Sequence, residues 1–354
     1  MEITVNRADT LKPHPDESNL GFGTIFTDHM FNMDYSPEKG WHNARIEPYQ
    51  PFTLYPATMV LHYGQAIFEG MKAYRTENGD VQLFRPKENF KRFQRSGHML
   101  CMPEFDEEFV LDALMQLLMI EKDWVPSAPG TSLYIRPTII ATDAYIGLRS
   151  SSTYRFFIIL SPVGAYYPEG FDPVKIWVTT DYVRAVRGGV GEAKTAGNYA
   201  ASLYATELAQ KDGYTQVMWL DGVELKYIEE VGSMNIFFVI GDELITPKLT
   251  GSILSGITRD SVITLAKSWG IKVVERRISI DEIYEGHRTG HLKEVFGSGT
   301  AAVISPVGQI KYNDNEIVIG EGKVGPIASK MFSELMDMQY GKAEDPFNWI
   351  HPLR

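Results

Sequence analysis

A lysine set among small residues is the feature of this sequence best suited to covalent chemistry. Lys194 lies in the stretch RGGVGEAKTAGNY, where glycine and alanine leave room for a ligand to approach the backbone. Most lysines are solvated surface residues, and that is the alternative interpretation of Lys194. An amine is nucleophilic only when neutral, so a chemical role for Lys194 requires burial or a neighbouring cation to lower its pKa.

Two adjacent carboxylates, Glu229 and Glu230, end a predicted strand in YIEEVGSMNIFF. Side chains alternate along a strand, so one of the two is expected to point inward and the other outward. An inward carboxylate is costly unless a cation faces it. The pair is therefore either an ordinary charged turn or the source of a carboxylate for a protonated ligand nitrogen.

Two turns and one helix carry groups that bind anions. SGITRD opens a predicted helix with Thr258 near its N-cap, and FGSGTAAV exposes backbone N–H groups together with the hydroxyls of Ser298 and Thr300. Helix N-termini and turns of this kind bind phosphate. A predicted helix that bears Arg92 adds a guanidinium, which binds phosphate through two donors. Together these features predict a phosphate site.

Other kinds of site fit the sequence less well. A P-loop around Lys194 would need glycine at position 193, where Ala193 stands, although a non-catalytic nucleotide-binding module remains the alternative from another class. The eight histidines form no H-E-x-x-H pair, and we expect no metal site. The sequence also has no G-x-S-x-G elbow and no complete G-x-G-x-x-G after a strand.

Composition disfavours nucleic-acid-binding, membrane and disulfide-rich proteins. The 354 residues include 34 Lys and Arg against 45 Asp and Glu, so the net charge is 34 − 45 = −11, which disfavours nucleic acid and anionic membranes as partners. No run approaches the roughly 18 apolar residues of a membrane span. The single cysteine, Cys101, excludes an internal disulfide framework. We therefore expect a soluble, cytoplasmic protein.

The elements of the first half predict a sheet with two helices. Residues 71–75 and 81–84 form a hairpin around Asn78-Gly79, and a helix begins near Pro86. A second helix is capped by Asp106, with leucines at helical spacing after it. The runs SLYIRPTIIA and YRFFIILSP are strands. The first 50 residues, rich in polar and turn residues, are expected to wrap a surface.

The second half alternates short strands with few helices, which predicts a barrel-like domain. Residues 198–212 form a helix stopped by Gly213, and hairpins are expected around Asp221-Gly222 and Gly241-Asp242. Glycine and proline at 164–173 mark the connection between domains. The predicted organisation is a small α/β domain at residues 1–165, a loop at 166–176 and a larger domain at 177–354.

These motifs occur, in this order, in one known family. HYGQAIFEGMKAYR, the arginine-bearing helix, LYIRPT, SPVGAYYPEG, GEAKTAGNYAAS, EEVGSMNIFF, SGITRDS and EVFGSGTAA resemble the corresponding segments of branched-chain amino-acid aminotransferases, which are pyridoxal 5'-phosphate enzymes of fold type IV. The resemblance extends from about residue 21 to the C-terminal helix. It implies a two-domain fold of α+β or α/β class that holds this cofactor.

The resemblance also implies roles for individual residues. Lys194 would form the Schiff base with the cofactor aldehyde, and Glu230 would face the pyridine nitrogen. The other implied contacts to the cofactor are Tyr199 at the ring hydroxyl and, at the phosphate, Arg92, Ile257, Thr258 and Thr300. The implied substrate-binding residues are Tyr63, Phe68, Tyr134, Arg136, Leu148, Tyr166, Ser233, Thr300 and Ala301. Leu148 would reach the pocket of the neighbouring subunit in a homodimer.

The function that the resemblance implies is transamination between L-leucine, L-isoleucine or L-valine and 2-oxoglutarate. Aromatic walls favour branched side chains, but one methylene contributes only about 1–3 kcal/mol, so discrimination among the three is expected to be modest. A D-amino-acid aminotransferase and an aminodeoxychorismate lyase of the same fold are the alternatives. Both resemblances are poorer, because those relatives are typically shorter.

Overall fold

The computed structural model describes residues 1–164 and 170–354, and these residues form two compact units. Unit 1 contains residues 1–164 together with Ala193–Gly197 and Asp337–Arg354, and unit 2 contains residues 170–192 and Asn198–Met336. The segment around Lys194 thus groups with unit 1, although the sequence interpretation assigned it to the second domain. The domain boundary at residues 166–176 stays a prediction.

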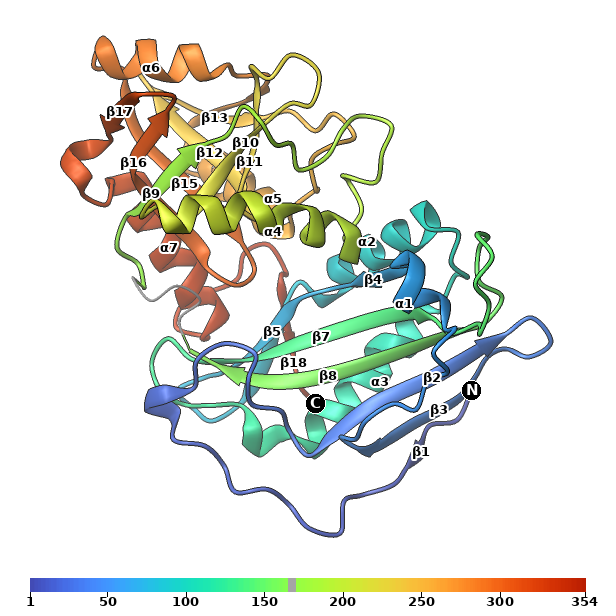
Figure 1. Cartoon of the computed structure of the whole chain (residues 1–354). Coiled ribbons are helices and arrows are strands. Elements are labelled where there is room, and N and C mark those ends of the chain that lie inside the picture. Colours follow the sequence, from blue (N-terminus) through green and yellow to red (C-terminus); the bar gives the residue numbers. More distant parts are fainter. Residues whose placement is uncertain (165–169) are drawn as a thin grey trace. The chain divides into compact units, whose positions relative to one another are not determined.

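Unit 1 is built on a nine-stranded sheet in the order β1-β3-β2-β8-β7-β5-β6-β18, with β4 paired to β7. Its strands β2, β3, β7 and β8 lie side by side in Figure 1. The strands are β1 (Thr4–Val5), β2 (His29–Ser36), β3 (Gly40–Pro48), β4 (Ala66–Phe68), β5 (Met71–Arg75), β6 (Val81–Phe84), β7 (Ser132–Ala141), β8 (Tyr154–Val163) and β18 (Ile350–Pro352).

The hairpin predicted in unit 1 is present, with the expected glycine in its turn. β5 and β6 pair antiparallel, and Gly79 has a φ of 83°, a value that L side chains rarely adopt. The first 50 residues, by contrast, were expected to wrap a surface, but they contain strands β2 and β3 of the sheet. β2 lies inside the sheet between β3 and β8, and its first half is buried.

The helices of unit 1 bury their apolar sides against the sheet. They are α1 (Met59–Tyr63), α2 (Pro86–Met99) and α3 (Glu107–Ile120). The Asp106 side chain accepts hydrogen bonds from the backbone N–H groups of Glu108 and Phe109, which confirms the predicted cap of α3. Phe90 and Phe93 of α2 are fully buried in the same core as the leucines of α3, which are Leu111, Leu114, Leu117 and Leu118.

Unit 2 has a second nine-stranded sheet, in the order β11-β10-β9-β16-β15-β12-β13-β14, with β17 paired to β16. Its strands are β9 (Val174–Val178), β10 (Gln216–Leu220), β11 (Ile228–Val231), β12 (Asn235–Ile240), β13 (Glu243–Pro247), β14 (Lys272–Arg276), β15 (Leu292–Gly299), β16 (Val303–Tyr312) and β17 (Asn315–Val318). The remaining helices are α4 (Ala196–Lys211), α5 (Ile257–Ser268), α6 (Ile280–Arg288) and α7 (Pro326–Gln339).

The sheet of unit 2 curls, as the barrel-like prediction requires. β11 stands at one end of the strand order, yet a tight turn with a bridge between Val231 and Met234 leads it directly into β12. Phe237 of β12 and Phe296 of β15 form a register pair and stack with their ring centroids 5.3 Å apart. Helix α5 packs against β14 and β15 and α6 against β15, so these helices cover the curled sheet.

One of the two hairpins predicted in unit 2 has a longer connection than expected. β12 and β13 join through Gly241-Asp242 as predicted, with Gly241 at a φ of 63°. Between β10 and β11, however, the chain makes a loop over residues 221–227. The Asp221 carboxylate stabilises this loop, because it accepts hydrogen bonds from the backbone N–H groups of Val223, Glu224, Lys226 and Tyr227.

Candidate active site

Lys194 belongs to a segment that is fixed to two elements of unit 1. The backbone N–H of Phe68 donates to the Lys194 carbonyl at 3.0 Å, and Ile67 of β4 forms a bridge with Thr195. The Lys194 N–H donates to the Ser96 hydroxyl of α2 at 2.9 Å. These contacts fix the backbone on both sides of the lysine, so its side chain begins from a defined position.

The Lys194 amine lies among charges that favour its neutral form. Burial lowers its pKa to about 8, and the Arg92 guanidinium adds to this effect while Glu69 opposes it. Nζ lies 4.9 Å from the centroid of the Phe68 ring. With a pKa of about 8, about one amine in ten is neutral at pH 7, far more than for an exposed lysine.

Glu69 is a member of this cluster that sequence reasoning did not single out. Its carboxylate accepts from Arg92 Nε at 2.7 Å and from Arg92 Nη2 at 2.9 Å, and Asn89 Nδ2 donates to it at 2.9 Å. The Gly70 N–H donates to it at 3.0 Å. Burial opposes the charged form of Glu69, but Arg92 and Lys194 outweigh burial and hold its pKa below the usual value. The only signal in the sequence was its position directly after Phe68.

Aromatic residues and a second arginine lie next to this cluster in unit 1. The Arg136 guanidinium stacks 4.7 Å from the centroid of the Phe68 ring and 5.2 Å from that of Tyr134. Arg136 Nη2 also donates to the Tyr134 hydroxyl at 3.2 Å. A Cβ on Gly70 would lie 2.0 Å from the Tyr134 hydroxyl, so a larger residue at this position would displace the Tyr134 ring. The structure thus brings Phe68, Tyr134 and Arg136 together.

Glu230 of unit 2 is a buried carboxylate held by several donors. It forms an ion pair with Arg184 Nε, and the Leu254 N–H and Asn235 Nδ2 donate to it at 3.3 and 3.4 Å. Burial raises its pKa to about 7, against the opposing effects of Arg184 and Leu254. A further cation next to Glu230 would favour its charged form, so the carboxylate is suited to a protonated ring nitrogen. Arg184 and Asn235 were not foreseen from the sequence.

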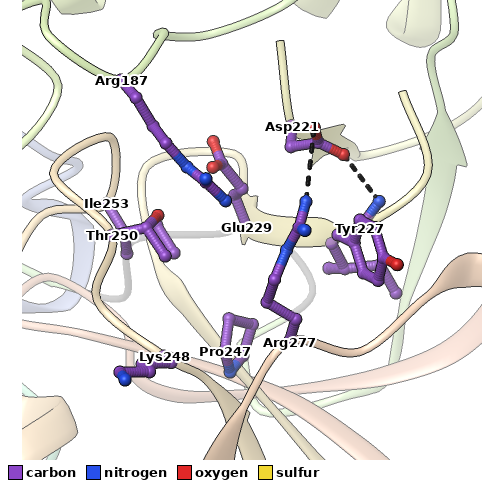
Figure 2. A pocket seen from close by; sticks show the side chains of 10 residues that line it. Arg187, Asp221, Tyr227, Glu229, Pro247, Lys248, Thr250, Ile253 and Arg277 are labelled. Carbon is purple, nitrogen blue, oxygen red and sulfur yellow. Dashed lines mark hydrogen bonds and ion pairs between the residues drawn. The ribbon is translucent and has the colours of Figure 1, made fainter. Parts of the chain in front are cut away.

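The expectation that one of the two adjacent carboxylates points outward is wrong. Glu229 is 6% exposed and Glu230 is 3% exposed. Glu229 accepts a hydrogen bond from the Ser252 hydroxyl at 2.5 Å, and it lines a small open pocket into which Arg187 also points (Figure 2). The loop residues 250–254 cover the strand and supply these donors, so the solvent expected on one face of β11 is replaced by protein.

The predicted anion-binding turns of unit 2 are linked through Asn235. Gly256 is the N-cap of α5, so Ile257 and Thr258 are its first helical residues, and the N–H groups of a first turn point beyond the helix end. A Cβ on Gly256 would lie 2.0 Å from Asn235 Oδ1. Asn235 in turn pairs with Ser298, which precedes the turn at Thr300 and Ala301. The helix terminus, this turn and Glu230 therefore lie near one another.

The remaining predicted residues vary in their surroundings. Tyr199 is half-buried on α4, and Ser233 is exposed in the turn after β11. Tyr63 is 40% exposed, and its hydroxyl donates to the Ile146 carbonyl. Leu148 is 84% exposed in the loop after β7. Tyr166 lies outside the described residues.

The described residues contain neither a metal-binding cluster nor a membrane-spanning helix. Residues 1–164 and 170–354 contain no group of three or more His, Cys, Asp or Glu side chains arranged to hold a metal ion. Within these ranges, no helix combines the length and the apolar character needed to cross a bilayer.

Comparisons with known proteins agree with this geometry. The family model for amino-transferase class IV matches residues 66–310. The branched-chain-amino-acid aminotransferase 2 of Bacillus subtilis is 56% identical over 98% of this chain and 96% of its own length. Branched-chain amino-acid aminotransferase structures from Escherichia coli, with a TM-score of 0.78 at 28% identity, and from T.th., with 0.74 at 26%, cover 92% of this chain and 99% and 98% of their own.

The structural match confirms the predicted two-domain fold of type IV, to which unit 2 contributes the curled sheet. The T.th. structure is a complex with N-(5'-phosphopyridoxyl)-L-glutamate, a molecule that joins the pyridoxyl phosphate group to an amino acid. High identity over nearly the whole length and a matching fold lead to the same assignment. The chain belongs to the class IV aminotransferases and, within them, to the branched-chain-amino-acid aminotransferases.

Proposed function

We propose that this protein transfers the amino group between L-leucine, L-isoleucine or L-valine and 2-oxoglutarate, with pyridoxal 5'-phosphate as its cofactor and Lys194 as its reactive amine. The observation that carries the proposal is the half-buried Lys194, whose pKa is lowered to about 8 by desolvation and by Arg92, beside the Arg92–Glu69 ion pair. A solvated surface lysine would have neither property.

Three features of the chain fit the cofactor. The Lys194 amine is suited to an aldehyde, and the buried Glu230 is suited to a protonated ring nitrogen, because its own pKa is raised to about 7 by burial. The hydroxyl of Ser298 is buried and has no hydrogen-bond partner among the residues that the structure describes, which leaves a polar atom beside the turn at Thr300 for a ligand.

The proposed contacts to the cofactor follow from these features. Arg92, Thr300 and the backbone N–H groups of Ile257 and Thr258 hold the phosphate, because a guanidinium and a helix N-terminus both favour an anion. Glu230 keeps the ring nitrogen protonated, and Tyr199 binds the ring hydroxyl. When bound, the cofactor supplies an electron sink for the negative charge that develops at the substrate Cα.

Lys194 acts in this proposal as the base and the acid of the reaction. The neutral amine would take the proton from the substrate Cα and deliver it to C4′, the cofactor carbon that carried the aldehyde, and a base whose pKa lies near the working pH does this most effectively. The contacts of its backbone with Phe68 and Ser96 keep the amine within reach of both positions.

The substrate pocket is proposed to have an aromatic part and a cationic part. Tyr63, Phe68 and Tyr134 supply apolar walls for a branched side chain, as does Tyr166. Arg136 binds the distal carboxylate of 2-oxoglutarate, and the Tyr134 hydroxyl orients this guanidinium. Backbone groups of Thr300 and Ala301 receive the substrate α-carboxylate, and Ser233 completes the wall. The L-glutamate part of the molecule bound by the T.th. enzyme supports this second substrate.

A homodimer and a cytoplasmic location are part of the same proposal. Leu148, Ile146 and Leu61 are large apolar side chains that are each more than 60% exposed. We propose that a second copy of the chain covers them and that Leu148 contacts the pocket of that copy. Sedimentation of the purified protein tests this, because Leu148→Asp should convert a dimer into a monomer.

The experiment that tests the proposed function compares three substrates under steady-state conditions. Transfer from L-leucine to 2-oxoglutarate should be at least tenfold faster than turnover of D-alanine or of aminodeoxychorismate, and Lys194→Ala should abolish it. Turnover of D-alanine without turnover of L-leucine would refute the assignment in favour of a D-amino-acid aminotransferase. A colourless protein that binds ATP would instead support the nucleotide-binding alternative.

A further inference from the structure

Glu69 is the most completely enclosed acid of the site in unit 1. Its side chain is 0% exposed, directly after β4, and both carboxylate oxygens are occupied. Oε1 accepts from Arg92 Nε at 2.7 Å, while Oε2 accepts from Arg92 Nη2 at 2.9 Å and from Asn89 Nδ2 at 2.9 Å. A two-point contact fixes the plane of a guanidinium as well as its distance.

This ion pair lies within electrostatic reach of Lys194. Arg92 and Arg136 disfavour the protonated amine, whereas Glu69 and Tyr134 favour it, and these four groups lie on α2, on β7 and directly after β4. The Glu69 backbone is also tied to the site, because its N–H donates to the carbonyl of Pro137 of β7 at 2.8 Å. Without the carboxylate, the buried Arg92 guanidinium would lose this two-point ion pair while staying close to Lys194.

We propose that Glu69 is a positioning residue, which holds the Arg92 guanidinium in a fixed plane and offsets its charge beside Lys194. This inference rests on the proposed role of Lys194 and adds a residue that acts through its neighbours. Glu69 sets how much of the Lys194 amine is neutral before any ligand arrives. Arg92 can then bind the phosphate while Glu69 partly offsets its effect on the pKa of Lys194.

The direction of the effect follows from the charges. In Glu69→Gln the amide keeps the size of the side chain but removes the anion. Glu69 then no longer offsets the effect of Arg92, so the pKa of the Lys194 amine should fall. A fall of about one pH unit from about 8 raises the neutral fraction at pH 7 about fivefold. Arg92→Gln should shift the titration in the opposite direction, and the double variant should return near the wild-type midpoint.

The experiment measures the titration of Lys194 in the cofactor-free protein. The full chain is labelled with a trace of acetic anhydride at pH values from 6 to 10, and the labelling rate of the peptide containing Lys194 is determined by mass spectrometry. Lys211, which is 67% exposed on its side chain, serves as an internal reference in the same digest. Only neutral amines react, so the pH dependence of the rate reports the protonation of each lysine.

Glu121→Gln is the matched control for removing a buried charge. Glu121 is 2% exposed in unit 1, pairs with His29 and accepts from the Asp28 N–H at 3.0 Å. This control should destabilise the protein to a similar extent but leave the Lys194 midpoint unchanged. A merely structural Glu69 would behave in the same way as Glu121.

The proposal is overturned if Lys194 titrates at the wild-type pH in Glu69→Gln. It is also overturned if Lys194 titrates at the same pH in the double variant as in Arg92→Gln alone. Should Glu69→Gln fail to fold, Arg92→Gln decides the question, because an unchanged midpoint there would mean that the pair does not act on Lys194. A wild-type Lys194 that titrates like Lys211 would instead refute the proposed function, so the two failures are distinguishable.

Discussion

Replacing Lys194 with methionine should stabilise the cofactor-free protein while it destroys the activity. Methionine has a similar length and carries no charge, so the substitution removes the cost of holding a protonated amine in a buried site. Burial and Arg92 lower the pKa of this amine from 10.5 to about 8, a difference of about 2.5 units. At about 1.36 kcal/mol per unit, the protonated amine destabilises the fold by about 3 kcal/mol.

The pH dependence of this gain follows from the same two pKa values. At pH 7 the amine is largely protonated in both states, and the folded state carries nearly the full cost. As the pH rises through about 8, the folded amine loses its proton whereas the unfolded one, with a pKa near 10.5, keeps it. The wild-type protein therefore becomes more stable between pH 8 and 10.5, and the advantage of Lys194→Met falls from about 3 kcal/mol at pH 7 to about 2 kcal/mol at pH 9.

Urea unfolding followed by tryptophan fluorescence measures this difference at the two pH values. Lys211→Met is the control, because Lys211 is exposed on the same stretch of chain and its replacement should change the unfolding free energy little at either pH. If Lys194→Met is no more stable than wild type at pH 7, the protonated amine does not carry this cost. A gain of equal size at pH 7 and pH 9 would also contradict it, since packing rather than charge would then be responsible.

Three further outcomes are expected. Glu230→Gln should still bind the cofactor but lose about 10²-fold or more in turnover, because a neutral amide does not keep the ring nitrogen protonated; near-normal kcat would count against its role. Gly70→Ala places a Cβ 2.0 Å from the Tyr134 hydroxyl and should raise the KM for 2-oxoglutarate more than that for L-leucine in steady-state assays. Asp221→Ala removes four hydrogen bonds to backbone N–H groups and should lower the urea-unfolding free energy by about 2–3 kcal/mol, with kcat retained.

Elements specified by local chemistry could be predicted from the sequence. Gly79 and Gly241 adopt the positive φ that tight turns require, and Asp106 caps α3 with its own side chain. The hairpin around Asp221-Gly222 was also predicted, and β10 and β11 do pair antiparallel, but the width of its loop was not foreseen. Four backbone N–H groups up to six residues away compete for the Asp221 carboxylate, and this favours a wider loop over a two-residue turn.

Parts of the site that depend on contacts between distant residues were not foreseen. Glu69 and Arg92 are 23 positions apart, and only the packing of α2 near β4 brings them together. Glu230 could be identified as a candidate because an acid at a strand end is conspicuous, but its partner Arg184 lies in an irregular segment with no pattern of its own. Strands β2 and β3 were missed because their pairing, rather than their composition, makes them strands.

Reduction with borohydride identifies the amine that bonds to the cofactor, which we propose is that of Lys194. The protein is loaded with pyridoxal 5'-phosphate, reduced, digested and mapped by mass spectrometry. The added pyridoxyl phosphate mass should appear on the peptide containing Lys194 and on no other lysine. An unmodified Lys194, or a label spread over exposed lysines such as Lys211, would contradict it.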